Sequence, residues 1–105
     1  MARRLPFAVV VDPAAKAELK ALRAYEQVRV VDAIDGNLVF DALVASRARK
    51  MLGEPKASFE YEPPLWELKV GELRVFYTVN EQTRTICICS VRAKPSGSTT
   101  EEVLR

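Results

Sequence analysis

Apolar and polar residues alternate along the second half of the chain, and this pattern predicts β-strands. The alternation covers Trp66 to Val70, Leu73 to Val79 and Thr85 to Arg92. Gly71-Glu72, between the first two segments, has the form of a two-residue hairpin turn with glycine at its first central position. We therefore predict a three-stranded antiparallel meander. The residues expected to be buried together on one face are Trp66, Leu68, Val75 and Tyr77.

The first half of the chain follows helical spacing after one short strand. "PFAVVVD" predicts the strand, and Asp12 followed by Pro13 has the composition of a helix N-cap and first helical position. This helix should continue to about Leu22. A second helix is expected to reach about Phe40, although Gly36 inside it weakens helix formation. The apolar stripe of that second helix consists of Val28, Val31, Ile34 and Leu38.

The remaining segments lack a regular period. Leu52–Pro64 contains three prolines and predicts an irregular connection, and the Gly/Ser-rich tail "KPSGSTTEEVLR" predicts a loop with a short helical turn begun by Thr99 or Thr100. A chain of 105 residues is long enough for one core and too short for two. The expected fold is a single α+β domain over residues 1–105, with an N-terminal strand, a two-helix hairpin and a three-stranded antiparallel meander.

The apolar segments exclude a transmembrane protein and favour a first strand over a signal peptide at the N-terminus. No apolar run approaches the ~18 residues of a membrane span. The N-terminal "MARRLPFAVVVDP" lacks a small-residue cleavage site and leads directly into a helix start, so we interpret it as the first strand rather than a signal peptide. The expected compartment is the cytoplasm, without a membrane partner.

The cysteine and histidine content limits the possible chemistry. Cys87 and Cys89 are the only cysteines, and the chain has no histidine. We therefore expect no metal centre and no cofactor, and we interpret the two cysteines as small buried residues on one strand face. Without histidine, the usual general base near neutral pH is missing. Any catalysis must use lysine, arginine, tyrosine, serine or carboxylates.

Positive charge is local rather than global. Sixteen basic residues and 14 acidic residues leave a net charge of only +2, so the distribution matters more than the total. "SRARK" contains Arg47, Arg49 and Lys50, and Arg92 and Lys94 close the last predicted strand. Each cluster alone also fits an ordinary solvated surface.

The hairpin contains an arrangement that is unfavourable for stability. If Gly71-Glu72 forms the turn, Lys69 lies directly opposite Arg74, and like charges in that position repel. A neighbouring cation lowers a lysine pKa, and arginine binds phosphate bidentately. Cleaving RNA needs a base for the 2′-OH, cations for the developing charge and an acid for the leaving oxygen. Lys69 and Arg74 are suited to this chemistry. Alternatively, both side chains extend into solvent or pair with Glu67 or Glu72 and have no catalytic role.

Three segments of the chain form a recognisable pattern, namely "SRARKML", "LWELKVGELRVFYTV" and "ICICSVRAK". Together they resemble the RelE/ParE superfamily, the toxins of bacterial type II toxin–antitoxin pairs. The resemblance implies the fold described above and an antitoxin protein as partner. It also implies one of two activities, because one branch of the superfamily cuts messenger RNA on the ribosome and the other poisons DNA gyrase.

The messenger-cutting branch implies particular residues. Glu67 stands where that branch can have a second lysine, and no tyrosine follows Tyr77. The leading expectation is a ribosome-dependent mRNA endonuclease. A DNA gyrase inhibitor and a catalytically inactive, antitoxin-binding relative remain open alternatives. By resemblance, the catalytic residues are Lys69, Arg74 and Lys94, and the RNA-binding residues are Arg47, Arg49, Lys50 and Arg92.

Overall fold

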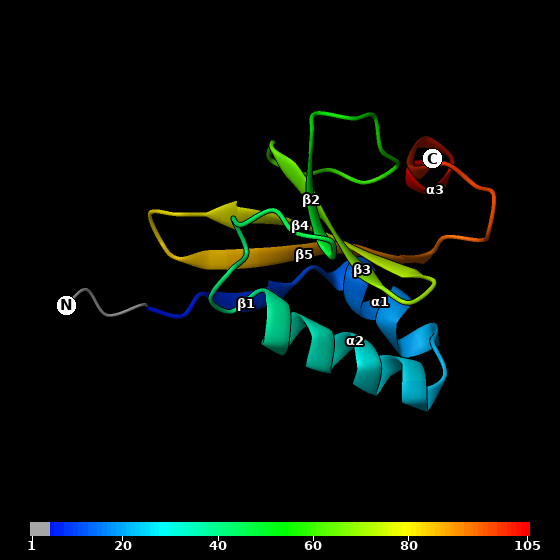
Figure 1. The fold of residues 1–105 in the computed structure, drawn as a ribbon, viewed down its shortest axis with the longest axis horizontal. Coiled ribbons are helices and arrows are strands. Elements are labelled where there is room, and N and C mark those ends of the chain that lie inside the picture. The colour runs from blue at the N-terminus through cyan, green and yellow to red at the C-terminus, as the bar shows by residue number, and fades with distance from the viewer. Residues whose placement is uncertain (1–4) are drawn as a thin grey trace.

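A five-stranded sheet is the centre of the computed structural model, which describes residues 5–105 (Figure 1). The strand order is β1-β5-β4-β3-β2, and only β1 pairs in parallel, with β5. The elements in chain order are β1 (Ala8–Val11), α1 (Pro13–Ala21), α2 (Ala24–Asn37), β2 (Arg49–Gly53), β3 (Leu65–Val70), β4 (Leu73–Asn80), β5 (Thr85–Ala93) and α3 (Thr100–Leu104).

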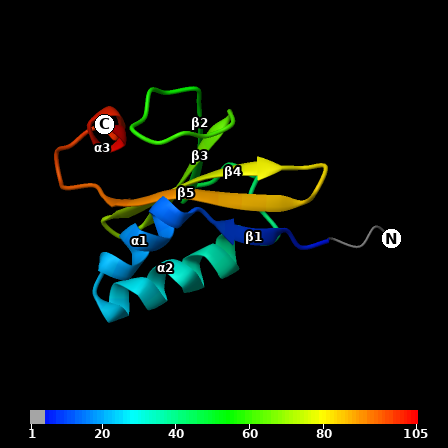
Figure 2. The same ribbon diagram turned by 180° about the vertical axis from the view of Figure 1, so that it is seen from behind.

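The two longer helices lie on one side of the sheet, as the views from front and back both show (Figures 1 and 2). Ala15, Val30 and Ile34 of these helices pack on the strand residues that point to this side, and together they form the main core. Val28 and Val31, expected on the apolar stripe of the second helix, are exposed instead. Tyr77 is buried there, and its hydroxyl donates a hydrogen bond to the Ala42 carbonyl at 2.7 Å. Burial raises the pKa of the Tyr77 phenol, and Arg49 opposes this weakly. All four residues expected on this face are buried, namely Trp66, Leu68, Val75 and Tyr77.

The opposite side of the sheet is partly covered by the 54–64 connection and by α3 (Figure 1). A second, smaller core forms here from Leu65, Phe76 and Leu104, all fully buried. Phe59 packs against this cluster from the connection. The tail is therefore part of the folded domain rather than an extension of it.

The tail helix begins as its sequence predicts. Thr99 is the N-cap, its hydroxyl accepts from the Glu102 amide, and the Glu102 carboxylate accepts from the Thr99 amide. These hydrogen bonds lower the pKa of the Glu102 carboxyl.

The predicted meander is confirmed, and so is the α+β architecture. Lys69 pairs with Arg74 and Val70 with Leu73, so Gly71-Glu72 is the two-residue turn. Within residues 5–105, no helix combines the length and the apolar content needed to cross a membrane.

Two boundaries differ from the prediction. Helix α2 ends at Asn37 rather than near Phe40, because the Val39 carbonyl accepts a hydrogen bond from the Phe7 amide and the chain leaves the helix to make it. The segment expected to be irregular begins later than Leu52, because β2 pairs with β3 as an edge strand and extends to Gly53.

Candidate functional site

The β3–β4 hairpin places Lys69 and Arg74 side by side on the face away from α1 and α2. The two residues are direct partners in the ladder. Gly71 makes the turn with φ of +59°, a conformation that costs other residues free energy. The Arg29 guanidinium of α2 packs over the turn, since a Cβ on Gly71 would lie 2.9 Å from its Nη2. The cation pair therefore sits on a closely supported turn.

The Arg74 side chain folds over that turn. Its Nη1 donates to the carbonyls of Gly71 and Leu73, each at 2.8 Å, while its buried Nε has no hydrogen-bond partner in the described part of the chain. Lys69 is exposed. The arrangement fixes Arg74 in place and leaves Lys69 accessible from solvent.

The last strand adds Lys94 to the same end of the sheet. Its amide donates to the Glu72 carbonyl at 2.7 Å, so it lies beside the hairpin turn. The charge of Lys94 also acts on Glu102 of α3, which lies over this face. Strand alternation from Arg92 puts the Lys94 side chain on the side of Lys69 and Arg74. The structure thus brings the three candidate catalytic residues to one end of one face.

Arg92 lies next to Arg74 in the ladder, but its guanidinium is engaged by the protein. It donates to the hydroxyls of Ser90 and Ser58 at 2.8 and 2.6 Å. It also forms an ion pair with Glu18 at 3.4 Å and lies over the Phe59 ring. Two further hydrogen bonds reach the tail carbonyls of Val103 and Arg105 at 2.9 and 3.1 Å.

The basic segment before the meander divides between the two sides of the sheet. Arg49 lies on the helical side, where it donates to the Val44 carbonyl and to the Asn37 side chain. Lys50 is exposed and pairs with Glu67 in the ladder, so it belongs to the face of Lys69. Arg47 is exposed in the loop before β2. Only Lys50 of these three shares the hairpin face through its strand position.

Glu67 is buried in the middle of that face, with 3% of its surface exposed. Its Oε2 atom has no hydrogen-bond partner among the described residues. A buried acceptor without a partner costs free energy, so this carboxylate is a destabilising feature of the sheet. It also separates the basic hairpin end from the rest of the face.

At the other end of the same face, Asp12, Cys87 and Cys89 lie together in a groove, a grouping that sequence reasoning did not find. Burial is the main cause that raises the pKa of the Cys87 thiol, and the nearby Asp12 carboxylate adds to this shift. Burial also raises the pKa of the Cys89 thiol to about 12, and the Cys87 thiol adds to that shift.

The same arrangement of strands and helices occurs in chains of two toxin–antitoxin complexes of known structure. In the RelBE2 toxin–antitoxin complex from Mycobacterium tuberculosis, a chain with 22% identity matches 86% of this chain over 100% of its own length, with a TM-score of 0.65. In the archaeal RelE–RelB complex from Pyrococcus horikoshii OT3, a chain with 19% identity matches 89% of this chain over 98% of its length, again with a TM-score of 0.65. The chain therefore shares its fold with these two chains.

The family model of the ParE toxin of type II toxin–antitoxin systems matches residues 9–94. This chain belongs to that toxin family. A comparison with curated protein sequences finds no match.

Proposed function

We propose that this toxin cleaves RNA at the hairpin end of the sheet, with Lys69, Arg74 and Lys94 as the catalytic residues. The observation that carries the proposal is the direct ladder pairing of Lys69 with Arg74, with Lys94 beside the turn that joins them. Like charges in this position cost stability, and a phosphate bound between them removes that cost. The expected substrate is messenger RNA on the ribosome.

Each residue has a role that its position allows. Lys69, exposed on the strand opposite Arg74, takes the proton from the 2′-OH. Arg74, fixed by the turn carbonyls, binds the phosphate that gains negative charge in the transition state. Lys94 protonates the leaving 5′ oxygen. Cleavage by 2′-OH attack uses these side chains alone and yields a cyclic phosphate and a free 5′ hydroxyl.

RNA binding would extend from this site to exposed cations of the basic segment before β3. Lys50 is exposed on β2 and can contact phosphates beside Lys69. Arg47 is exposed nearby in the chain and can reach the backbone of a bound strand. Arg49 and Arg92 are less suitable, since both guanidinium groups already bind the protein.

Inhibition of DNA gyrase is a second candidate, and the engaged Arg92 favours it. RNA cleavage benefits from every cation near the phosphate, but Arg92 is committed to the tail and to Ser58. The buried carboxylate of Glu67 also lies on the face that RNA would approach. A toxin that only binds its target needs neither a free Arg92 nor a catalytic lysine. Both targets lie in the cytosol, which is the compartment we propose.

An antitoxin is the proposed protein partner. Helix α2 presents exposed apolar side chains from Tyr25, Val28 and Val31, which a partner segment can bury. We expect that segment to bring a carboxylate to Arg74 or its neighbours, neutralising the cation pair. The antitoxin should therefore raise the melting temperature in a concentration-dependent way.

The deciding experiment incubates the purified toxin with translating ribosomes and maps messenger ends, with DNA supercoiling by gyrase measured in parallel. Arg74→Ala should slow cleavage by ~10² or more, since one preorganised charge-stabilising donor contributes about 3 kcal/mol to the transition state. Lys69→Ala and Lys94→Ala should slow it comparably. Lys20→Ala, which removes an exposed cation from α1, is the matched control.

Cleavage that survives Arg74→Ala at wild-type levels would end the catalytic assignment. Loss of supercoiling with no new messenger ends would establish the gyrase candidate instead.

A further inference from the structure

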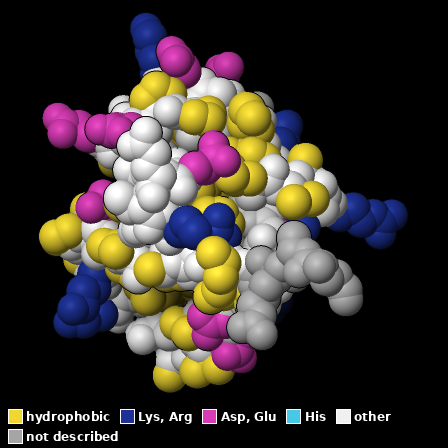
Figure 3. All heavy atoms as spheres, turned by 90° about the vertical axis from the view of Figure 1, so that its left-hand side faces the viewer, with side chains coloured by type: hydrophobic (Ala, Val, Ile, Leu, Met, Phe, Trp, Pro, Cys, Tyr) yellow, Lys and Arg dark blue, Asp and Glu magenta, His cyan; other side chains and the backbone are white. Residues whose placement is uncertain are grey.

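A groove of about 1180 Å³ lies at the end of the sheet opposite the cation pair, where β4 turns into β5. Four acidic residues line it, while none of the described residues that line it is lysine or arginine. Figure 3 faces this end of the molecule and shows acidic side chains on several parts of its surface. The four are Asp12, Glu60, Glu62 and Glu81. The groove therefore favours a cation over an anion.

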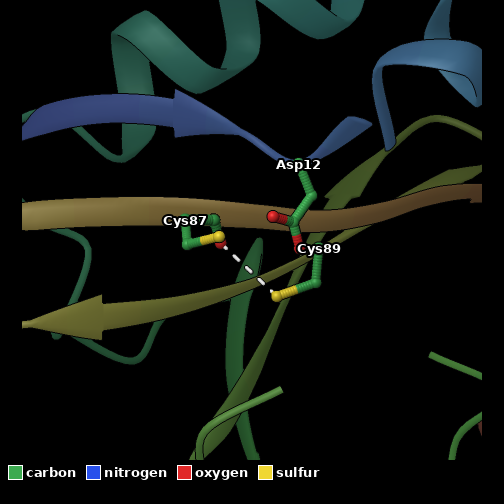
Figure 4. A group of neighbouring side chains, drawn as sticks. All are labelled: Asp12, Cys87 and Cys89. Carbon is green, nitrogen blue, oxygen red and sulfur yellow. Dashed lines mark hydrogen bonds between the residues drawn. The ribbon is translucent and has the colours of Figure 1, made fainter. Parts of the chain in front are cut away.

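Three side chains in the groove offer ligand atoms to one point. A carboxylate oxygen of Asp12 and the sulfur atoms of Cys87 and Cys89 all lie within 4.8 Å of one another (Figure 4). Two thiolates on one tetrahedral zinc ion are about 3.8 Å apart, because each Zn–S bond measures ~2.3 Å. Small side-chain movements are therefore enough to place all three atoms on one ion.

The backbone explains why these three groups meet. The ladder between β4 and β5 shifts register between Phe76 and Tyr77, so Cys89 is an extra residue in a β-bulge. Its thiol reaches back to the Cys87 carbonyl at 3.6 Å. Cys87 and Cys89 both line the groove, as their spacing of two residues on one strand predicts, and the bulge puts Ser90 opposite Phe76 in the ladder.

The third group comes from the end of β1. The Asp12 amide donates to the Ile88 carbonyl at 3.0 Å, which fixes Asp12 against β5 between the two cysteines. Asp12 is the N-cap of α1, a position where aspartate usually accepts from the first helical amides. Its side chain makes no such hydrogen bond. The carboxylate lies beside the thiols instead (Figure 4).

We propose that Asp12, Cys87 and Cys89 bind a thiophilic divalent cation of the zinc type. Two thiolates and a carboxylate are ligands that Zn²⁺ accepts, and its fourth position would face the groove. Binding deprotonates both thiols, and the two protons go to solvent. The ion would join the β1–α1 junction to the bulge of β5 and offset the negative charge of the groove.

This site is separate from the proposed RNA site in residues and in position. The cation pair lies at the β3–β4 turn, whereas the cysteines lie next to the β4–β5 turn at the other end of β4. The two proposals can therefore fail independently.

The test uses the full chain, freed of metal by a chelator, kept reduced and then desalted. Zn²⁺ is titrated by calorimetry, and Cd²⁺ is titrated by its thiolate charge-transfer absorption. We expect one ion per chain. At a free Zn²⁺ concentration a hundred times the dissociation constant, the melting temperature should rise by on the order of 10 °C.

Three variants and one control assign the ligands. Cys87→Ser and Asp12→Asn, neither at a fully buried residue, should each weaken Zn²⁺ binding by about 100-fold or more and abolish the rise in melting temperature. Cys89→Ser should do the same and lose the cadmium absorption. Glu60→Gln removes a groove carboxylate that is not a ligand and should leave the affinity within about twofold.

Binding of Zn²⁺ by Asp12→Asn at wild-type affinity would overturn the proposed site. A loss of Zn²⁺ affinity in Glu60→Gln as large as in the ligand variants would also overturn it, because that result indicates diffuse attraction to the groove. Circular dichroism of each metal-free variant shows whether it is folded. If Cys89→Ser does not fold, Cys87→Ser and Asp12→Asn decide the question, because both residues are partly exposed.

Discussion

Arg92→Ala should destabilise the protein by about 3 kcal/mol. The guanidinium donates four hydrogen bonds, two to serine hydroxyls and two to tail carbonyls. Each contributes about 1 kcal/mol net, with less from the exposed contact to Arg105. The ion pair to Glu18 adds at most a fraction of 1 kcal/mol, because the two side chains are 21% and 32% exposed. Arg92→Lys should lose about two thirds as much, since an ammonium cannot reach all four acceptors at once.

The free energy of unfolding is measured by urea denaturation, and exchange of the α3 amides reports separately on the tail. Arg92→Ala should lower the urea midpoint by 1 M or more, given a slope of roughly 1–3 kcal/mol/M. It should also expose the α3 amides to fast exchange, because Leu104 loses the anchor beside it. Lys20→Ala is the control. A change below 0.5 kcal/mol with protected α3 amides would show that the guanidinium does not hold the tail.

Three further predictions concern the turn, the buried carboxylate and the thiols. Gly71→Ala should destabilise the protein by about 1–2 kcal/mol, because φ at Gly71 is +59°. Gly36→Ala, in an open helical position, should stabilise it by up to about 1 kcal/mol. Urea midpoints equal to that of the wild type would contradict both predictions. Glu67→Met should raise the free energy of unfolding by about 1 kcal/mol or more, since it removes a buried acceptor without a partner, and a loss of stability would refute this. In metal-free protein, alkylation of Cys89 at pH 8 should be roughly 10²- to 10³-fold slower than in a short peptide, because the raised pKa of the thiol lowers its thiolate fraction. The rate should increase as the pH rises toward 12. Alkylation at the peptide rate would exclude the raised pKa.

The sequence was sufficient for the meander because its signal is local. Alternating apolar residues and a glycine turn determine both the strands and their register, so the opposition of Lys69 and Arg74 could be stated before the structure was known. The repulsion expected between Lys69 and Arg74 is only part of the energy of this pair. The structure adds two hydrogen bonds from Arg74 to the turn, which offset that repulsion.

The features that sequence reasoning missed depend on distant contacts. Strand β2 is short and basic, and it becomes a strand only by pairing with β3. The bulge at Cys89 cannot be read from alternation, which would place Arg92 and the cysteines on opposite faces. The Arg92 contacts join residues up to 74 positions apart, from Glu18 to the tail. A pattern within one segment contains no information about such partners.

The face away from α1 and α2 carries two opposite electrostatic environments, and the small core of Leu65, Phe76 and Leu104 lies on it with them. The hairpin end carries the cations Lys69 and Arg74, and the groove end carries carboxylates and thiols. Glu67 lies buried on this face, and its Oε2 atom has no hydrogen-bond partner within residues 5–105. The stability lost by burying this carboxylate is offset by a gain in function only if its negative charge acts on the nearby hairpin cations. Glu67→Gln keeps the shape of the side chain and removes its charge. This variant therefore distinguishes a purely structural defect from a charge that acts on the hairpin cations. A purely structural defect predicts greater stability and unchanged toxicity, whereas a charge that tunes the hairpin cations predicts an altered cleavage rate in the same protein.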